Sequence, residues 1–322
     1  MRRRLWWGIR AVALGLGLLA AMSMPASVDS TQANVTAAAV PARTLKIMTW
    51  NICSGNNTRC RFYQHPDELV GTVRRQMLDN GTPTDAAILQ EFCASFARPL
   101  ELELEAHSGR GWDVRFVPIK IKRGENAAAA PDFRCDRGRG SYGIALAVPD
   151  ENTWWDARYL PSPQGEEWRV AVCATVESWR LKLCNTHLSY GGDDPSGSFR
   201  ARQLPAYLAF VGSPSAPYRV VFGGDLNMPP ASKQIAPAYD SFVECAQSSQ
   251  ASPRSGPGTS YATSPHDNAK SAKIDYMFTN PQLTHTCSVP QDVVESSDHR
   301  PMWITVRLPA STSRGGPVGA YR

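Results

Sequence analysis

Short apolar runs recur along the chain, and most of them end in polar residues. Runs of this kind, rich in aliphatic, β-branched and aromatic side chains, predict strands. They lie at 45–53, 85–92, 112–120, 141–149, 168–178, 180–188, 219–227, 273–280 and 301–308. In the run 168–178, Val170, Val172 and Val176 fall on one face, and the run 180–188 follows almost at once. These two runs therefore predict a hairpin.

Three segments have the 3.6-residue apolar period of helices: 65–81, 93–107 and 197–212. In the first, Leu69 and Val73 share a face, and Gly81 predicts the end of the helix. The other two each contain a proline, which indicates a break or a helix start in one and a local defect in the other. Many strands with a few interspersed helices indicate one α/β domain over residues 43–308.

The first 42 residues differ from the rest. Four arginines among residues 2–10 precede an apolar run at 11–22, which is the order of a secretory signal peptide. The run is too short for an ordinary membrane span of about 20 residues. We expect a signal peptide and linker over 1–42 and a secreted protein, with an uncleaved anchor as the alternative. The polar, glycine-rich segment 309–322 predicts a disordered tail.

Composition and charge limit the classes of function. Hydrophobic residues make up 42% of the chain, enough for a sizeable core. The formal net charge of +5 falls to about +2 without the arginine-rich leader. A nearly neutral protein has no global electrostatic footprint for nucleic acid, although a local basic patch remains compatible with this value.

All eight cysteines follow the leader, and an even count in an exported chain predicts disulfides. No C-x-x-C pair occurs, which argues against a zinc ribbon or a thioredoxin-type motif. Cys173 and Cys184 face each other if the predicted hairpin turns at Ser178 and Trp179. The expected pairs are Cys53–Cys60, Cys93–Cys135, Cys173–Cys184 and Cys245–Cys287.

Polar side chains gather at the ends of the predicted strands. The set comprises Asn51, Glu91, Asn185, His187, Asp225, Asn227, Asp275, Asp298 and His299. Each alone has an ordinary explanation, such as a turn cap or a surface charge. Together they indicate an active site, because polar groups at the ends of rigid elements are held in place. The glycines before Asp225 would let the backbone approach a phosphate and a metal closely.

These motifs follow one another in a familiar order: MTWNI, LQE, YGIAL, NTHL, GGDLN, IDY and SDHRP. The series resembles the endonuclease/exonuclease/phosphatase superfamily, which includes deoxyribonucleases, abasic endonucleases, neutral sphingomyelinases and inositol polyphosphate 5-phosphatases. The resemblance extends from about residue 45 to residue 308. It implies an α/β four-layer sandwich, in which two mixed β-sheets pack face to face with helices on both outer faces.

The resemblance also implies roles for single residues. Glu91 would bind Mg²⁺ directly, helped by Asn51 and Asp298, and Mn²⁺ would substitute. Mg²⁺ prefers carboxylate oxygens and keeps several waters, so few protein ligands suffice. Asp225 would orient or deprotonate the attacking water.

The remaining positions would act on the phosphate. Asn227 and His187 would hold non-bridging oxygens, and Asp275 would fix the tautomer of His299 and favour its charged form. His299 could then bind or protonate a phosphate oxygen. Arg169 is a further candidate for phosphate contact.

Arg137 and Arg139, in a glycine-spaced loop, are also candidates for phosphate contact, and exposed surface charge is the alternative for all three arginines. Trp154 and Trp155 would form either an aromatic platform or part of the packed core or sheet edge.

Three functions remain open on the sequence. The first is a secreted Mg²⁺-dependent nuclease or general phosphodiesterase, the second a sphingomyelinase-like or inositol phosphatase-like hydrolase, and the third a degenerate binding module. The complete set of polar residues argues against the third. The leader and the lack of a long hydrophobic insertion favour the first. We expect a monomer that acts on nucleic acid or another phosphodiester, without stable membrane insertion after cleavage.

Overall fold

The computed structural model describes residues 39–247, 253–261, 271–290 and 296–312. The predicted signal peptide, most of the predicted linker and residues 313–322 of the predicted tail lie outside the described residues. Among the residues that are described, no helix has both the length and the hydropathy of a membrane span.

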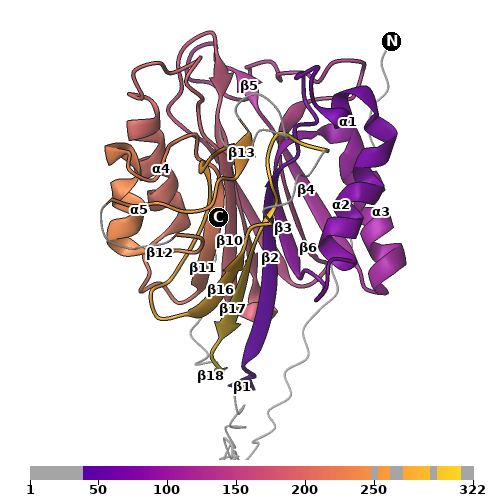
Figure 1. The fold of residues 1–322 in the computed structure, drawn as a ribbon, viewed down its shortest axis with the longest axis vertical. Helices are drawn as coiled ribbons and strands as arrows, with labels where there is room; N and C mark the ends of the chain where they lie inside the picture. The colour runs from indigo at the N-terminus through magenta and orange to yellow at the C-terminus, as the bar shows by residue number, and fades with distance from the viewer. Residues whose placement is uncertain (1–38, 248–252, 262–270, 291–295, 313–322) are drawn as a thin grey trace, which may run out of the picture. The chain divides into compact units, whose positions relative to one another are not determined.

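Two six-stranded mixed sheets form the centre of the domain (Figure 1). The first has the order β16 (Thr284–Ser288), β17 (Met302–Leu308), β2 (Arg43–Asn51), β3 (Ala86–Cys93), β6 (Tyr142–Pro149), β4 (Trp112–Pro118). The second has the order β12 (Val243–Glu244), β15 (Asp275–Thr279), β11 (Arg219–Asp225), β10 (Leu181–His187), β9 (Val170–Val176), β7 (Thr153–Tyr159). In each sheet the central pair, β2–β3 or β10–β11, is parallel and the other pairs are antiparallel.

Helices cover the outer face of each sheet (Figure 1). The first sheet carries α1 (Arg61–Gln64), α2 (Leu69–Leu78) and α3 (Ala97–Ser108), and the second carries α4 (Arg200–Val211) and α5 (Ala236–Ser241). Four 3₁₀ turns accompany them: η1 (Pro66–Glu68), η2 (Ala94–Phe96), η3 (Glu177–Trp179) and η4 (Lys233–Ile235). The expected four-layer α/β sandwich is confirmed.

The alternation of side chains in the central strands explains the layers. In β2, Leu45 and Ile47 point into the core between the two sheets, whereas Met48 and Trp50 join the core under α2 and α3. In β10, Leu183 faces the core between the sheets and Cys184 faces α4. Both faces of each sheet are therefore buried, which explains the nearly continuous apolar runs in the sequence.

Several short or exposed strands were not predicted by the pattern of apolar and polar residues. The edge strands β7 and β16 were not predicted, nor were the two-residue pairs β5 (Lys120–Ile121) with β8 (Glu167–Trp168) and β13 (Ser260–Tyr261) with β14 (Ser271–Ala272). Trp154 and Trp155 lie on β7, where Trp155 packs against the core and Trp154 is 61% exposed. They belong to the edge of the sheet.

One pair of short strands lies just outside residues 43–308. Strands β1 (Ala39–Val40) and β18 (Ser311–Thr312) pair with each other, so the predicted linker and the predicted tail each contribute a short strand.

The structure contains the four predicted disulfides, Cys53–Cys60, Cys93–Cys135, Cys173–Cys184 and Cys245–Cys287. Cys173 and Cys184 are directly opposite each other in the β9–β10 pair, whose connection is the turn η3. The expected hairpin is therefore confirmed. Four disulfides indicate folding in an oxidising, extracytoplasmic environment.

Candidate active site

The carboxyl ends of the two parallel strand pairs open into one pocket of about 360 Å³. It is lined by Asn56, Asn57, Glu91, Phe133, Tyr142, Glu167, Arg169, His187, Tyr190, Asp225, Asn227 and His299. Six of the predicted site residues are among them, and Asn51, Asp275 and Asp298 contact these six or their neighbours. The structure thus brings together groups that are up to 248 positions apart in the chain, from Asn51 to His299.

Glu91 reaches the pocket because β3 is irregular at its end. The register between β3 and β6 shifts between Leu89 and Phe92, and Glu91 has a φ of 53°. Positive φ is uncommon outside glycine and requires support from the surroundings. Ser54 supplies that support, since its backbone N–H (3.1 Å) and its hydroxyl (2.7 Å) both donate to the Glu91 carbonyl. This local bulge turns the carboxylate toward the site.

Asn51 connects the two sheets at the base of the pocket. Its Nδ2 donates to Glu91 Oε1 at 3.0 Å and to Asp225 Oδ2 at 3.1 Å, and its Oδ1 accepts from the backbone of Cys53. The side chain is fully buried. Its amide nitrogen, and not its oxygen, therefore faces the two carboxylates, which differs from the arrangement expected of a direct metal ligand.

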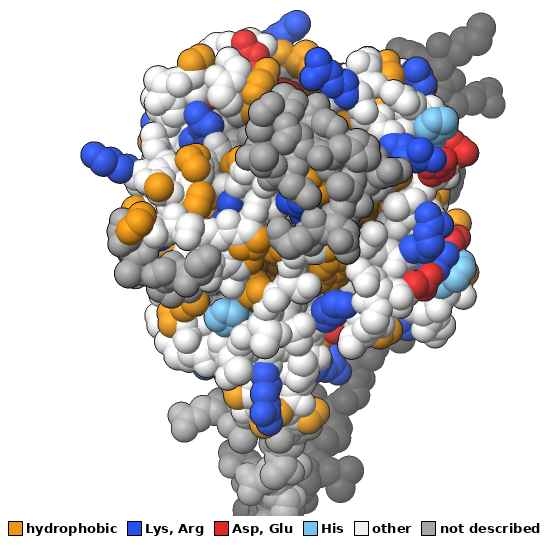
Figure 2. Space-filling view, in the orientation of Figure 1, with side chains coloured by type: hydrophobic (Ala, Val, Ile, Leu, Met, Phe, Trp, Pro, Cys, Tyr) orange, Lys and Arg blue, Asp and Glu red, His pale blue; other side chains and the backbone are white. Residues whose placement is uncertain are grey.

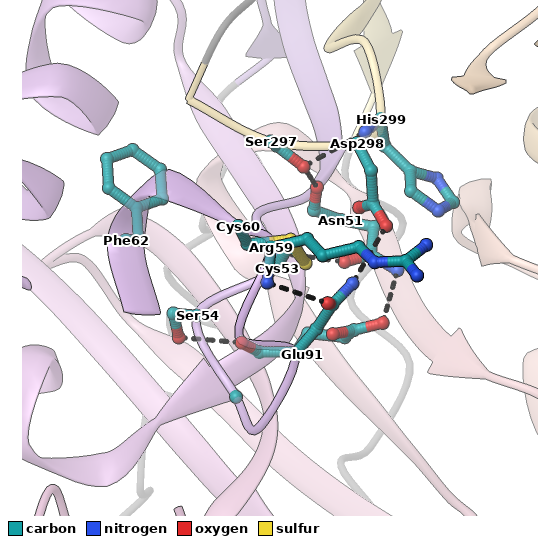
Figure 3. Close-up of a disulfide and its surroundings, with 12 residues drawn as sticks. Asn51, Cys53, Ser54, Arg59, Cys60, Phe62, Glu91, Ser297, Asp298 and His299 are labelled. Carbon is teal, nitrogen blue, oxygen red and sulfur yellow. Dashed lines mark hydrogen bonds between the residues drawn. A yellow bond between two sulfur atoms is a disulfide. The ribbon is translucent and has the colours of Figure 1, made fainter. Parts of the chain in front are cut away.

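Asp298 lies beside Glu91 in the loop that leads into β17 (Figure 3). Two bonds fix this loop to the end of β2: Ser297 Oγ donates to the Asn51 carbonyl at 2.7 Å, and Trp50 Nε1 donates to the His299 carbonyl at 2.9 Å. Asn57, from the loop closed by the Cys53–Cys60 disulfide, donates to Asp298 Oδ2 at 3.3 Å. The other oxygen, Oδ1, is buried and has no hydrogen-bond partner among the described residues.

The acids on this side of the pocket fit a divalent cation. Burial and the neighbouring Asp298 carboxylate raise the pKa of Glu91 to about 7, against the opposing effects of Asn51 and His299. Two carboxylates that repel each other at low exposure, one with an unpartnered oxygen, are stabilised by a bound positive charge. Glu91 and Asp298 therefore suit direct ligation, and Asn51 is placed to orient Glu91.

His299 stands between two acids of the second sheet. Its Nδ1 lies 2.8 Å from Asp275 Oδ2, and its Nε2 lies 3.8 Å from Asp225 Oδ2. Burial alone would lower the pKa of His299, but Asp275, followed by Asp225, raises it well above its ordinary value. The ligand atoms of these three residues lie within 4.8 Å of one another. A charged imidazole has no free lone pair for a metal, so the group is better suited to proton handling.

Asp225, at the end of β11, is 2% exposed. Its Oδ1 accepts from the backbone N–H of Asn227 at 2.9 Å, and its Oδ2 lies 3.5 Å from His187 Nε2. Burial and the Asp275 charge raise the pKa of Asp225 to about 7, although His299 and Asn51 act in the opposite direction. A carboxyl with a pKa near neutrality is suited to accept a proton from water.

His187 and Asn227 form the wall beside Asp225. Asn227 Nδ2 lies 3.1 Å from His187 Nε2, and Asn227 has a φ of 52°, which turns its side chain back toward β10. Burial, followed by the charges of Arg169 and His299, lowers the pKa of His187 well below its ordinary value. His187 is therefore neutral, in contrast to His299.

The two glycines before Asp225 have a role besides the predicted one. A Cβ atom at Gly223 would lie 1.9 Å from the carbonyl oxygen of Tyr276 in β15, and one at Gly224 would lie 2.0 Å from that of Thr186 in β10. Gly224 also has a φ of 122°. The two glycines thus allow the neighbouring strands to approach closely, and the approach of a phosphate or metal to them stays a prediction.

Of the predicted arginines, only Arg169 lines the pocket. Its buried guanidinium pairs with Glu167 and Asp193, each at 3.1 Å. Arg139 is used elsewhere, since its guanidinium donates to the backbone carbonyls of Ser54, Gly55 and Asp136.

The expectation that Arg139 contacts phosphate is thus corrected, because its donors are engaged by the loop that carries Asn56 and Asn57. Arg137 is exposed and stacks on Tyr63, with its guanidinium 4.4 Å from the ring centroid.

Asn185, the remaining polar strand-end residue, lies below the pocket. Its Nδ2 donates to the carbonyls of Leu89 and Ala145, at 2.8 and 2.9 Å, and its Oδ1 accepts from Gln90 at 2.8 Å. Asn185 thus joins β10 of the second sheet to β3 and β6 of the first. Its role is to hold the two sheets together beneath the site.

Sequence reasoning missed several residues that line the pocket: Asn56, Asn57, Phe133, Tyr142, Glu167 and Tyr190. The pair Asn56–Asn57 follows the motif MTWNI inside a short cysteine-bounded loop, and this position beside the site was the available signal. The aromatic residues and Glu167 come from loops and strand starts whose proximity depends on the fold, so the pattern of apolar and polar positions offered no comparable signal for them.

Comparison with known proteins identifies the family to which this fold belongs. The profile of the Endonuclease/Exonuclease/phosphatase family matches residues 48–299. The chain therefore belongs to this family, whose members hydrolyse phosphate esters and generally use divalent metal ions. None of the curated protein sequences compared with the chain matches it significantly.

Solved structures of low identity share the fold. An endonuclease/exonuclease/phosphatase from Beutenbergia cavernae is 20% identical, with a TM-score of 0.58 over 83% of this chain and 72% of that one. The human Nocturnin catalytic domain with bound sulfate is 14% identical, with a TM-score of 0.53 over 82% and 93%. A mannosyl-6-phosphatase from Bacteroides thetaiotaomicron is 14% identical, with a TM-score of 0.54 over 81% and 99%.

Proposed function

We propose that this chain is a secreted, Mg²⁺-dependent phosphodiesterase that cleaves nucleic acid, with residues 43–308 as its catalytic domain. One observation carries the proposal: the carboxyl ends of β3 and β11, together with the loop that leads into β17, place Glu91, Asp225 and His299 in a single pocket. The exported location rests on the signal-peptide pattern of the first 42 residues and on the four disulfides.

Glu91 and Asp298 would hold the cation, with Mg²⁺ as the natural ion and Mn²⁺ as a substitute. Asn51 positions Glu91 through the 3.0 Å hydrogen bond from its amide. When bound, the ion neutralises charge on the phosphate oxygens. This assignment requires both acids to be ionised, although burial and mutual repulsion oppose it in the metal-free protein.

Asp225 accepts the proton of the attacking water. Its raised pKa makes it a stronger base than an ordinary aspartate, and Asn51 and Asn227 fix the orientation of its two oxygens through hydrogen bonds. His299, held charged by Asp275, donates to a phosphate oxygen or to the leaving oxygen. Asn227 donates to a non-bridging oxygen once the phosphate replaces its contact with His187, and the neutral His187 donates to it in the tautomer that carries the proton on Nε2.

Nucleic acid is the favoured substrate class because extracellular nucleic acid is available to a secreted enzyme and because the site set matches the deoxyribonuclease-like pattern. Binding would depend little on long-range charge. On the face shown in Figure 2, the visible Lys and Arg side chains are scattered. At the right, over the helices, some of them lie beside Asp and Glu side chains. Arg169, at the pocket, is already paired with two acids.

A substrate panel tests the proposal. The purified mature protein is assayed with Mg²⁺ or with EDTA against plasmid DNA, RNA, sphingomyelin, inositol polyphosphate and p-nitrophenyl phosphate, with Asp225→Asn to exclude a contaminating enzyme. We expect DNA or RNA cleavage that EDTA abolishes and that Asp225→Asn lacks. Turnover of sphingomyelin, inositol polyphosphate or the monoester without nucleic-acid cleavage would show that the proposed substrate class is wrong. Full activity in EDTA would refute the requirement for a metal ion.

A further inference from the structure

The pocket is lined by aromatic as well as charged side chains, and we call the aromatic ones its aromatic side. Phe133, Tyr142 and Tyr190 line it together with the catalytic acids. The side chain of Tyr190, a large hydrophobic residue, is 48% exposed. Among the described residues, such a half-exposed ring within a pocket leaves a flat apolar face open, which is the kind of surface on which planar ligands stack.

Tyr190 is fixed in its position by its own loop. A Cβ atom at Gly192 would lie 2.3–2.6 Å from atoms of the Tyr190 ring and from its hydroxyl, so the ring rests against the Gly192 backbone. The nearby Asp193 raises the pKa of the Tyr190 hydroxyl, and Asp193 in turn pairs with the buried Arg169 at 3.1 Å. The ring is therefore ordered before any ligand arrives, and a ligand that stacks on it loses little conformational entropy.

The other two rings are fixed in a similar way. Tyr142 lies edge-on to Phe133, with the ring centroids 5.4 Å apart. A Cβ atom at Gly55 would lie 2.5 Å from the Tyr142 ring, so this ring also rests on a glycine backbone. The backbones of Gly192 and Gly55 thus position the two tyrosine rings of the pocket.

We propose that this aromatic side is a subsite for a nucleobase next to the scissile phosphate, with Tyr190 as the stacking residue. The inference rests on the proposed function and refines it, because it states that the enzyme recognises the nucleoside as well as the phosphate. Stacking accepts every base, so the subsite would raise the rate for nucleotides without selecting a sequence.

Two small substrates with the same leaving group test the subsite. The first is the p-nitrophenyl ester of thymidine 5′-monophosphate, and the second is methyl p-nitrophenyl phosphate, which has no base. For wild type with Mg²⁺ we expect kcat/KM to be at least tenfold higher for the thymidine ester. Tyr190→Ala should lower this ratio about tenfold, in the range found for a base that stacks on an aromatic side chain.

Two further variants distinguish stacking from a general disturbance. Gly192→Ala should lower the ratio as well, because the new methyl group displaces the Tyr190 ring. Tyr190→Phe should keep most of the ratio, because it retains the ring. Trp154→Ala is the matched control, since this tryptophan is exposed on β7 and lies outside the pocket, and it should keep the wild-type ratio.

A wild-type ratio near one, or an unchanged ratio in Tyr190→Ala, would overturn the subsite while leaving the proposed function in place. Hydrolysis of neither ester would count against the proposed function. In that case calorimetry decides the subsite independently: thymidine 5′-monophosphate should bind the Mg²⁺-loaded protein about tenfold more tightly to wild type than to Tyr190→Ala. Equal affinities would refute it.

Discussion

The two sheets have the same arrangement of strands but contribute different chemistry to the site. The first sheet and the loop into β17 supply Glu91 and Asp298, two acids of which Asp298 raises the pKa of Glu91. The second sheet supplies Asp225, Asp275 and the neutral His187. One side thus fits a divalent metal, and the other side fits proton transfer.

The difference shows why the site depends on how the sheets pack. Asn51 of the first sheet contacts Asp225 of the second, and His299, from the loop into the first sheet, contacts Asp275 of the second. Each sheet therefore completes the environment of a catalytic group on the other. Variants that affect one side alone should separate metal binding from proton transfer.

The largest effect should follow from breaking the proton-transfer side. Asp225→Asn and His299→Ala should each lower kcat by about 10²–10⁴-fold, because the first removes the base and the second removes the charged imidazole beside it. Steady-state assays on DNA measure this. Asp240→Asn, an exposed aspartate on α5, is the control and should have wild-type activity. Near-normal rates in either site variant would mean that the two roles are misassigned.

Asp225→Asn should also stabilise the metal-free protein at alkaline pH. Because the pKa of Asp225 is raised to about 7 in the folded state, its contribution to stability is present at low pH and is lost as the pH rises through 7. Asparagine, like the protonated acid, is uncharged, and it stays uncharged at every pH. In EDTA at pH 8, Asp225→Asn should therefore unfold at a higher temperature than wild type, by about 2–4 °C per kcal/mol gained. A lower melting temperature would contradict the assigned pKa.

A smaller effect should come from Asp275→Asn, which acts on His299 through its Nδ1 contact. Asp275 raises the pKa of His299, so its removal should lower that pKa and leave His299 neutral at a lower pH. The alkaline limb of the pH–kcat profile should move to lower pH, while kcat below that limb changes less. An unshifted alkaline limb would show that the charge of His299 does not limit the rate.

Asn185 tests the contact between the sheets rather than the chemistry. Asn185→Ala removes the side-chain hydrogen bonds to two backbone carbonyls and to the Gln90 amide. The expected loss is about 2–4 kcal/mol of the free energy of unfolding, measured by urea denaturation. Asn152→Ala, an exposed asparagine before β7, should cost less than about 0.5 kcal/mol. Equal effects of the two substitutions would exclude a special role for Asn185.

The sequence predicted most of the strands and the three longer helices, because these depend on local periodicity, and it predicted the four disulfides. A disulfide can be derived from the sequence where two neighbouring strands face each other. The Cys173–Cys184 pair is an example, since it follows from one hairpin register. Strands β7 and β16 were missed because edge strands bury only part of their side chains and show no continuous apolar run.

The site was predicted as a set of residues but not as a geometry. The bulge at Glu91, the direction of the Asn51 amide and the engagement of Arg139 by backbone carbonyls depend on residues far away in the chain. The glycines before Asp225 were assigned to a ligand, and they also accommodate the strands on either side. Patterns along the sequence identify which side chains are available, and tertiary packing decides which atoms they present.

Metal binding by two variants tests the division between the sheets most directly. Mn²⁺ binding is measured by calorimetry for wild type, Glu91→Gln and Asp225→Asn at pH 7.5. We expect Glu91→Gln to bind at least tenfold more weakly, because it loses a carboxylate ligand, and Asp225→Asn to bind within about threefold of wild type while it remains inactive. Loss of Mn²⁺ binding in Asp225→Asn with retention in Glu91→Gln would place the metal on the second sheet and contradict the account.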